Sequence, residues 1–485
     1  MIKRRRLPEH LFLLTTGILV LSILLYSCRG GESTEVTESA PAPPLTSSAT
    51  SKITTSTTTP KMITSTTTET TISTTTETTV TTAEETTLTE IYKSGLLTED
   101  ETWSGIVHIT GDVTLKAELT LTILPGTKVL FAAHQDDQHS EGAVPLDDWI
   151  AQHNDPTWTE EYAQSHSSMA IYGTLIARGT PENRITFTSD SPTPDAGDWI
   201  QVHFGHNSII QYCIIEYARG GLDTMVNTGE SITIDHNIIR NTLWSGISIH
   251  SSSPTVTNNE IIHAGGHQGI DVIGEGSAPL ITHNIIKECM GGINILDGNS
   301  PIIEYNTLIN NEHPIGVSGQ RTNAIIRHNS ISCPDGPSSH FTYKGEVIYP
   351  SMSLLNEQFF ISGIVINNAS PIISNNEISN CNCAGIDIMG VSSPIITGNT
   401  IHQNVEGILF QESFTGTPVI ERNNIFDNRK SNIKLWPGML LTAVNNWWGT
   451  TDIEEIKAKF LNIYDEPGWE LVIFEPFLLE PVKTE

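Results

Sequence analysis

Basic residues are scarce in this chain. It has 25 Lys and Arg residues against 55 Asp and Glu residues, which gives a formal net charge of −30 at pH 7. Proteins that bind nucleic acids need a basic surface, so this composition argues against that class of partner. The charge also disfavours direct docking of a polyanionic sugar unless a divalent cation bridges the two. A surface that simply keeps an exported protein soluble would carry the same charge.

Cysteine is also rare. The six cysteines are Cys28, Cys213, Cys289, Cys333, Cys381 and Cys383. Five remain besides Cys28, and an odd number excludes complete disulfide pairing in an exported chain. Cys381 and Cys383 are too close in sequence for an ordinary metal knuckle, so most of the five are predicted to be small buried hydrophobes. The sequence has neither an EF-hand nor a His-Glu-x-x-His motif.

The chain has one long apolar run near its start, and this run is short for a membrane-spanning helix. It covers residues 11–26 and follows the basic segment Lys3-Arg4-Arg5-Arg6. Leu25-Tyr26-Ser27-Cys28 comes next and resembles a bacterial lipobox, although Tyr26 departs from the small residue usual there. We expect a signal peptide over 1–28, with Cys28 lipidated. An uncleaved anchor and cleaved secretion are the alternatives, and each places the bulk of the protein outside the cytoplasm.

The segment 29–92 consists mainly of residues 30–90, which lack the aromatic residues and the apolar periodicity that a folded domain needs. Threonine and serine dominate this segment from Thr46 onward. A composition of this kind does not bury enough apolar surface to fold. We therefore predict a disordered stalk that holds the rest of the chain at the cell surface.

The most regular feature of the remaining sequence is an asparagine that returns every 22 to 25 residues, with one step of 47 that carries an insertion. Its copies are Asn237, Asn259, Asn284, Asn306, Asn329, Asn376, Asn399, Asn423 and Asn446. A period of this length predicts a solenoid. Stacked asparagines at one corner would satisfy backbone groups that are buried at the bend.

A second phrase keeps the same period. A glycine precedes alternating apolar residues at Gly246, Gly269, Gly292, Gly316, Gly363, Gly385 and Gly407. Period-two alternation predicts short strands with one face inward. Each coil should therefore contain at least two strands, which stack on their copies about 4.8 Å away.

At these repeats the chain resembles the right-handed parallel β-helix proteins of the pectin-lyase-like superfamily. The first coils, around Leu121-Thr122-Ile123-Leu124-Pro125-Gly126-Thr127, and the closing Asn445-Asn446-Trp447-Trp448-Gly449 are similar to those of bacterial surface members. The resemblance implies an all-β solenoid over 93–450 and a cap over 451–485. We expect the cap to hold a helix over about 453–462 and a strand over 469–474. Activity does not follow, because this superfamily hosts lyases, hydrolases, epimerases and adhesins.

Three insertions interrupt the repeat, over 132–168, 188–197 and 333–362. Each follows the same phrase of the coil, so all three should leave from one corner. Five coils lie between the second and the third, which predicts a trough of roughly 24 Å. A trough of this length suits a chain-like ligand, although loops on a solenoid can also lack any ligand.

The first insertion is rich in groups that could bind a ligand. Asp136, Asp137 and His139 could hold a divalent cation, with Ca²⁺ favoured by oxygen ligands and Zn²⁺ or Mn²⁺ admitted by the histidine. Trp149 and Trp158 could stack on a sugar ring. The alternative is two short capped helices, the second of them beginning at Asp155-Pro156.

The outward residues of the glycine strands should form one column. We assign to it Ser248, Asp271, Asn294, Ser318, Val365, Asp387 and Leu409. Asp271 with Arg240 and His267 nearby could perform acid–base chemistry on a glycoside or uronate, with Asn294 as a binding residue. The column could equally be polar because water faces it. Polygalacturonase-like hydrolases carry a Gly-His-Gly motif, whereas this chain has Gly266-His267-Gln268-Gly269, in which a glutamine separates the histidine from the second glycine.

These features support a surface-anchored protein whose groove on the insertion side binds an extracellular polysaccharide. The first alternative is an enzyme at the same groove, either a Ca²⁺-dependent polysaccharide lyase or a glycoside hydrolase. The second is an adhesin or surface-layer spacer. Contact with the membrane is expected through the lipid anchor only.

Overall fold

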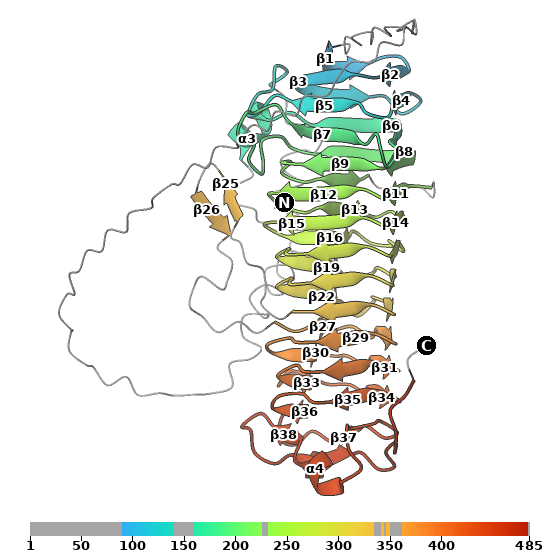
Figure 1. Cartoon of the computed structure of the whole chain (residues 1–485), viewed down its shortest axis with the longest axis vertical. Coiled ribbons are helices and arrows are strands. Elements are labelled where there is room, and N and C mark those ends of the chain that lie inside the picture. Colours follow the sequence, from blue (N-terminus) through green and yellow to red (C-terminus); the bar gives the residue numbers. More distant parts are fainter. Residues whose placement is uncertain are drawn as a thin grey trace, which may run out of the picture. The chain divides into compact units, whose positions relative to one another are not determined.

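The computed structural model describes residues 90–139, 159–225, 231–333, 341–343, 346–349 and 361–483. These residues form a right-handed stack of coils, as predicted, whose strands join into a single parallel sheet of 35 strands (Figure 1). The first strand begins at Glu90, three residues before the predicted start. No helix among the described residues is long and apolar enough to cross a membrane.

Each repeating coil contributes three strands, which stack into three faces. Face A consists of β10 (Leu222–Thr224), β13 (Ile247–His250), β16 (Gln268–Ile273), β19 (Gly291–Ile295), β22 (His313–Ser318), β27 (Ile364–Asn367), β30 (Ala384–Met389), β33 (Glu406–Phe410) and β36 (Ser431–Leu435). Face B consists of β11 (Thr233–Asp235), β14 (Thr255–Thr257), β17 (Leu280–Thr282), β20 (Ile302–Glu304), β23 (Ile325–Arg327), β28 (Ile372–Ser374), β31 (Ile395–Thr397) and β34 (Val419–Glu421). Face C consists of β12 (Ile238–Thr242), β15 (Glu260–Ala264), β18 (Ile285–Lys287), β21 (Thr307–Ile309), β24 (Ser330–Ser332), β29 (Glu377–Ser379), β32 (Thr400–His402) and β35 (Asn424–Phe426).

The first coils are built from longer strands that run from one face to the next. They are β1 (Glu90–Leu97), β2 (Glu101–Trp103), β3 (Ile106–Leu115), β4 (Thr120–Ile123), β5 (Lys128–Phe131), β6 (Met169–Arg178), β7 (Ile185–Ser189), β8 (Val202–Gln211) and β9 (Cys213–Glu216). The start of β8 pairs with β10 on face A, and its end pairs with β11 on face B. The early coils therefore set the register of the faces below.

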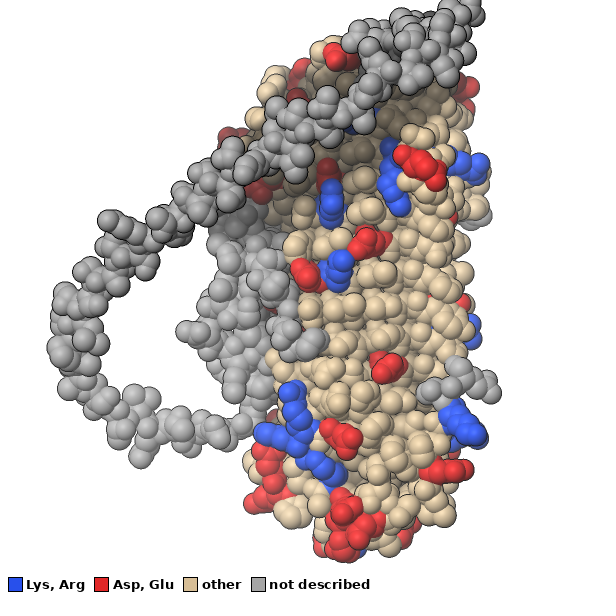
Figure 2. Space-filling model, viewed as in Figure 1, with Lys and Arg blue, Asp and Glu red and all other residues tan. Residues whose placement is uncertain are grey.

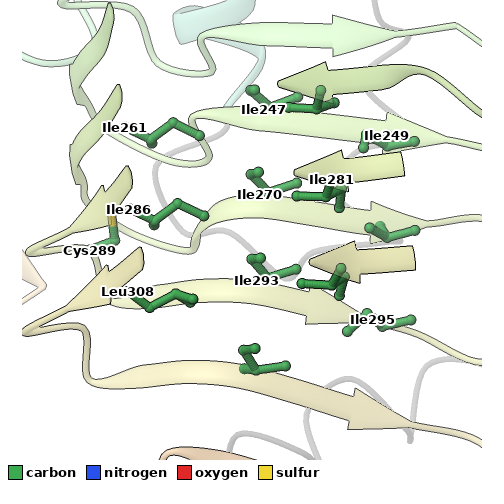
Figure 3. Packing of buried hydrophobic residues seen from close by; sticks show 14 of the residues in the cluster. Ile247, Ile249, Ile261, Ile270, Ile281, Ile286, Cys289, Ile293, Ile295 and Leu308 are labelled. Carbon is green, nitrogen blue, oxygen red and sulfur yellow. The ribbon is translucent and has the colours of Figure 1, made fainter. Parts of the chain in front are cut away.

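The interior is a stack of aliphatic side chains in register. Ile247, Ile270 and Ile293 follow one another on β13, β16 and β19 and are fully buried (Figure 3). Burial of one such side chain contributes about 1.5–3 kcal/mol. Because every coil repeats these contacts with its neighbours, the core is continuous along the solenoid.

The predicted asparagine ladder lies at the corner between faces B and C. The Asn306 Nδ2 group donates to the Ile281 carbonyl at 2.9 Å and to Asn329 Oδ1 at 3.0 Å. Its Oδ1 atom accepts from the backbone N–H of Asn284 at 2.9 Å. The residue before each ladder asparagine has a positive φ, for example 55° at Tyr305. The Tyr305 and His328 rings at this position stack, with centroids 4.9 Å apart.

A second ladder, which the sequence analysis missed, lies at the corner between faces C and A. Asn404 donates from Nδ2 to Asn428 Oδ1 at 3.2 Å, and its own Oδ1 accepts from the Cys381 N–H at 3.0 Å. Asn311 Oδ1 likewise accepts from the Cys289 N–H at 3.0 Å. The three asparagines stand five residues after members of the first ladder, and this fixed offset is visible in the sequence.

The repeated glycine allows close approach between coils at the start of several face A strands. A Cβ atom on Gly246 would lie 2.8 Å from the Gly269 carbonyl oxygen and 2.8 Å from the Ile261 side chain. Real Cβ atoms do not approach other atoms this closely. The glycine in the phrase is therefore selected by packing between neighbouring coils.

The C-terminal end differs from prediction in detail. Helix α4 (Ile453–Lys457) begins at the predicted residue but ends earlier than expected. The side chain of Asp452, just before it, accepts hydrogen bonds from two backbone N–H groups of its first turn. Phe460–Asn462 instead forms strand β38, which pairs with β36 and adds one more rung to face A. The predicted last strand is a 3₁₀ helix, η3 (Trp469–Leu471), followed by the two-residue strand β39 (Val472–Ile473), which pairs with β37 (Leu441–Thr442).

All three insertions leave the solenoid from the same corner, as predicted. They follow β5, β7 and β24 of face C and return to face A. Five face A strands, β10 to β22, lie between the second and the third. The first insertion contains α3 (Glu160–Ser165), whose N-cap is Thr159 rather than the predicted Asp155. The third contains an antiparallel hairpin of β25 (Phe341–Tyr343) and β26 (Glu346–Tyr349).

Candidate functional site

Asp271 lies on β16 of face A between two of its predicted partners. His267 Nδ1 is 3.0 Å from Asp271 Oδ2, and the Asn294 side-chain amide donates to Asp271 Oδ1 at 2.9 Å. The Asp271 residue is fully buried. The His267 ring stacks on Trp244 with centroids 4.8 Å apart, which fixes the plane of the imidazole. The structure thus brings Asp271, His267 and Asn294 together.

A second carboxylate of the same kind lies two rungs away, on β10. His203 Nδ1 is 3.0 Å from Asp223 Oδ2, and His250 Nε2 is 3.3 Å from Asp223 Oδ1. The Gln201 amide also donates to Asp223 Oδ2 at 3.1 Å. Asp223 is 3% exposed. Imidazoles beside a buried carboxylate can move or hold a proton at that position.

Asp223, Ser248 and Asp271 occupy the same register position on successive strands. Two rungs of a parallel sheet separate the Cα atoms of the two aspartates by about 9.6 Å. We call Asp223, Asp271, His203, His250 and His267 the acid–histidine group.

Sequence analysis missed Asp223, although a signal for it was present. Gly221-Leu222-Asp223 repeats the phrase Gly269-Ile270-Asp271 two coils earlier. The glycines used to predict the column begin at Gly246, so the coil of Gly221, one repeat earlier, was left out. His203 and His250 reach Asp223 from neighbouring strands, and their proximity follows from the register of β8, β10 and β13.

The prediction that Ser318 belongs to the column of outward residues is wrong. The register pairs Asn294 with Gly316, which in turn pairs with Val365, so Gly316 stands where Ser318 was expected. Ser318 pairs with Asn367 instead. Further along, Asp387 accepts two hydrogen bonds from the Gln411 amide, at 2.9 and 3.1 Å.

The prediction that Arg240 acts with Asp271 is wrong. Arg240 lies on β12 of face C, whereas Asp271 lies on β16 of face A. The Arg240 guanidinium pairs with Glu216 on the neighbouring coil at 2.7 Å. Pairs of this kind, with Lys287–Glu260 as another, recur on the solenoid, and Figure 2 shows opposite charges side by side on the face in view.

Two of the predicted metal ligands, Asp136 and Asp137, accept hydrogen bonds from the protein itself. Asp136 Oδ1 accepts from the N–H groups of Asp112 at 3.0 Å and Gln138 at 2.9 Å. Asp137 accepts from the Thr110 hydroxyl at 2.6 Å and the Gln138 amide at 2.7 Å. Burial alone would raise the pKa of Asp137, but these hydrogen bonds hold it below its ordinary value. Over the described ranges, no three His, Cys, Asp or Glu side chains are grouped as metal ligands. A cation at Asp136, Asp137 and His139 stays a prediction.

Three other predicted residues lie outside the described residues. They are Trp149, Trp158 and Cys28. Their predicted roles, which are sugar stacking for the tryptophans and lipidation for the cysteine, stay predictions.

Comparison with known proteins identifies the repeat. The family of the right-handed β-helix region matches residues 161–277, 225–349 and 359–447, which together make more than half of the chain. A search of curated proteins finds no match.

Several solved structures are similar to this chain at low identity. An alginate lyase from Paenibacillus sp. str. FPU-7 is 13% identical, with 61% of this chain and 92% of that one covered and a TM-score of 0.31. The Agl-KA catalytic domain is 14% identical, with 78% and 61% covered and a TM-score of 0.33. A periplasmic alginate epimerase is 13% identical, with 74% and 69% covered and a TM-score of 0.25.

Similarity at this level says nothing about activity, since this fold carries several chemistries. The repeat, the two ladders and the family match agree on the architecture. The chain therefore belongs to the right-handed β-helix family.

Proposed function

We propose that this protein binds an extracellular polysaccharide across face A and hydrolyses it with Asp223 and Asp271. The observation that carries the proposal is the acid–histidine group, in which two buried carboxylates share one register column and each has an imidazole within 3.0 Å. A column that was polar only because water faces it would have no reason to bury its carboxylates. This arrangement favours an enzyme over a passive binding surface.

The two carboxyl groups would divide the work of glycoside hydrolysis. One donates its proton to the glycosidic oxygen as the bond to carbon breaks, and the other takes a proton from the attacking water. His203 and His267 hold the carboxyl groups in position and can relay protons to solvent. The Asn294 amide donates a hydrogen bond to Asp271 Oδ1 and so fixes the orientation of that carboxyl group.

The charge of the chain selects among polysaccharides. A net charge of −30 repels polyanions, so a neutral polysaccharide fits this face better than a polyuronate. The five face A strands between the second and third insertions give a bound chain a length of roughly 24 Å.

Export and anchoring belong to the same proposal. The signal peptide over 1–28, the lipidated Cys28 and the threonine-rich stalk would place the solenoid at the cell surface. A protein in that position meets polysaccharides before they enter the cell.

An array of neutral and acidic polysaccharides, probed first with Ca²⁺ and then with EDTA, tests the proposal. Products of every bound polymer are then sized, with wild type compared to Asp223→Asn and Asp271→Asn. Asp235→Asn is the matched control, because Asp235 on face B is also hydrogen-bonded to two side-chain amides, at 2.7 and 3.0 Å. We expect shortened products from wild type and the control, and none from either face A variant.

Binding that leaves the polymer intact would favour the second candidate, a polysaccharide-binding module, which the uninterrupted polar strands of face A also support. Unsaturated products would replace hydrolysis by a lyase reaction. Silence across the array in both conditions would refute both carbohydrate functions and leave an adhesin or a spacer.

A further inference from the structure

Two cysteines meet on neighbouring coils at the corner between faces C and A. Cys333 follows β24 and Cys381 follows β29, and these two strands pair in parallel on face C. Both residues are buried, at 1% and 0% exposed. Their sulfur atoms lie 2.7 Å apart, which is closer than the van der Waals contact of two sulfurs.

The other described thiols of the ladders lack such a neighbour. The backbone N–H of Cys213 donates to the side chain of Asn237, and that of Cys289 donates to Asn311, on the adjacent rung. Only at Cys333 and Cys381, among these four buried cysteines, does one thiol face another.

We propose that Cys333 and Cys381 form a disulfide bond in the exported protein. The two thiols lose two protons and two electrons, a sulfur–sulfur bond forms, and a disulfide oxidant of the export compartment is reduced to a dithiol. The structure holds both residues as thiols, so the bond represents a covalent modification that the exported chain acquires.

The Cys333–Cys381 pair lies at the base of the third insertion, so a bond there would affect the insertion and the coils beside it. The third insertion lies between the two cysteines, and β24 and β29 are the strands of face C that flank it. A bond between Cys333 and Cys381 closes the coil across the insertion. It would therefore hold the end of the face A segment that the proposed function uses.

The timing of the reaction follows from burial. Burial raises the pKa of the Cys381 thiol well above its ordinary value, so little reactive thiolate exists once the coil is folded. The bond must then form while the chain is folding, when oxidants still reach the sulfurs.

The test uses the full chain purified without reductant from the exported fraction of the expressing cells. Free thiols are blocked with N-ethylmaleimide in guanidinium, and a digest is analysed by mass spectrometry before and after reduction. We expect a linked pair of peptides that fragmentation assigns to Cys333 and Cys381. Recovery of both residues carrying N-ethylmaleimide before reduction would overturn the proposal, and so would a link from Cys333 to Cys383.

Variants add a readout that does not depend on the digest. Cys333→Ser, Cys381→Ser and the double variant should lower the melting temperature by the same amount, and reductant should lower that of wild type equally. Cys289→Ser is the matched control, because it removes a buried ladder thiol and should leave the effect of reductant unchanged. A double variant that is still sensitive to reductant, or a wild type that is not, would contradict the inference. None of these outcomes depends on polysaccharide hydrolysis.

Discussion

The asparagine ladder can be tested at its centre with Asn306→Ala. Asn306 is 1% exposed, and the substitution removes the acceptor of the Asn284 backbone N–H and the donor to the Ile281 carbonyl. Alanine cannot replace either bond. Each buried group left unsatisfied costs about 1–3 kcal/mol, so two groups should destabilise the protein by about 4 kcal/mol.

The matched control is Asn323→Ala in the next coil. Asn323 is exposed, and its amide makes only one long hydrogen bond, at 3.3 Å, to the Arg321 carbonyl. Its substitution should change stability by less than about 0.5 kcal/mol.

Urea unfolding followed by circular dichroism measures both variants. Because solenoid repeats can unfold in stages, the comparison is made at each transition rather than from one fitted midpoint. If Asn306→Ala is no more destabilised than Asn323→Ala, the ladder does not satisfy otherwise buried backbone groups, and the account given for the corner is wrong.

Three further predictions concern single side chains. Gly246→Ala should destabilise the protein by about 1–3 kcal/mol in the same urea assay, because the added Cβ would meet the Gly269 carbonyl oxygen; unchanged stability would show that the coils can move apart. Arg240→Ala should leave product formation from any active polysaccharide unchanged, because Arg240 lies on face C, whereas loss of products would reinstate it beside Asp271. Burial lowers the pKa of His313 from 6.5 to about 4, so the unfolded chain takes up its proton first as the pH falls. Stability should therefore be complete above about pH 6.5 and decline toward pH 4, and the urea midpoint should drop less between pH 7 and pH 5 in His313→Gln than in wild type.

Much of the fold could be read from periodicity alone. The repeating asparagine gave the length of a coil, the glycine phrase marked a strand, and the interruptions located three insertions on one corner. These predictions succeeded because a solenoid makes its contacts between residues one period apart. The helix predicted over 453–462 was too long, because pairing of Phe460–Asn462 with β36 outweighed the helical pattern.

The site was predicted less completely. His267 and Asn294 were predicted as partners of Asp271 and contact it, whereas Arg240 lies on face C and pairs with Glu216. The difference arises because the phase within a coil, and not distance along the chain, decides which face a residue joins.

The sequence by itself determined the repeat, the inward side chains and the corner from which the insertions leave, since each depends on a local pattern that recurs. Only the tertiary structure decided which outward residues share a rung. Ser318 and Gly316 differ by two positions, and the register of β19 with β22 chooses between them. The same register brings His203 and His250 to Asp223 and sets Cys333 against Cys381, because hydrogen bonds between coils fix the alignment residue by residue.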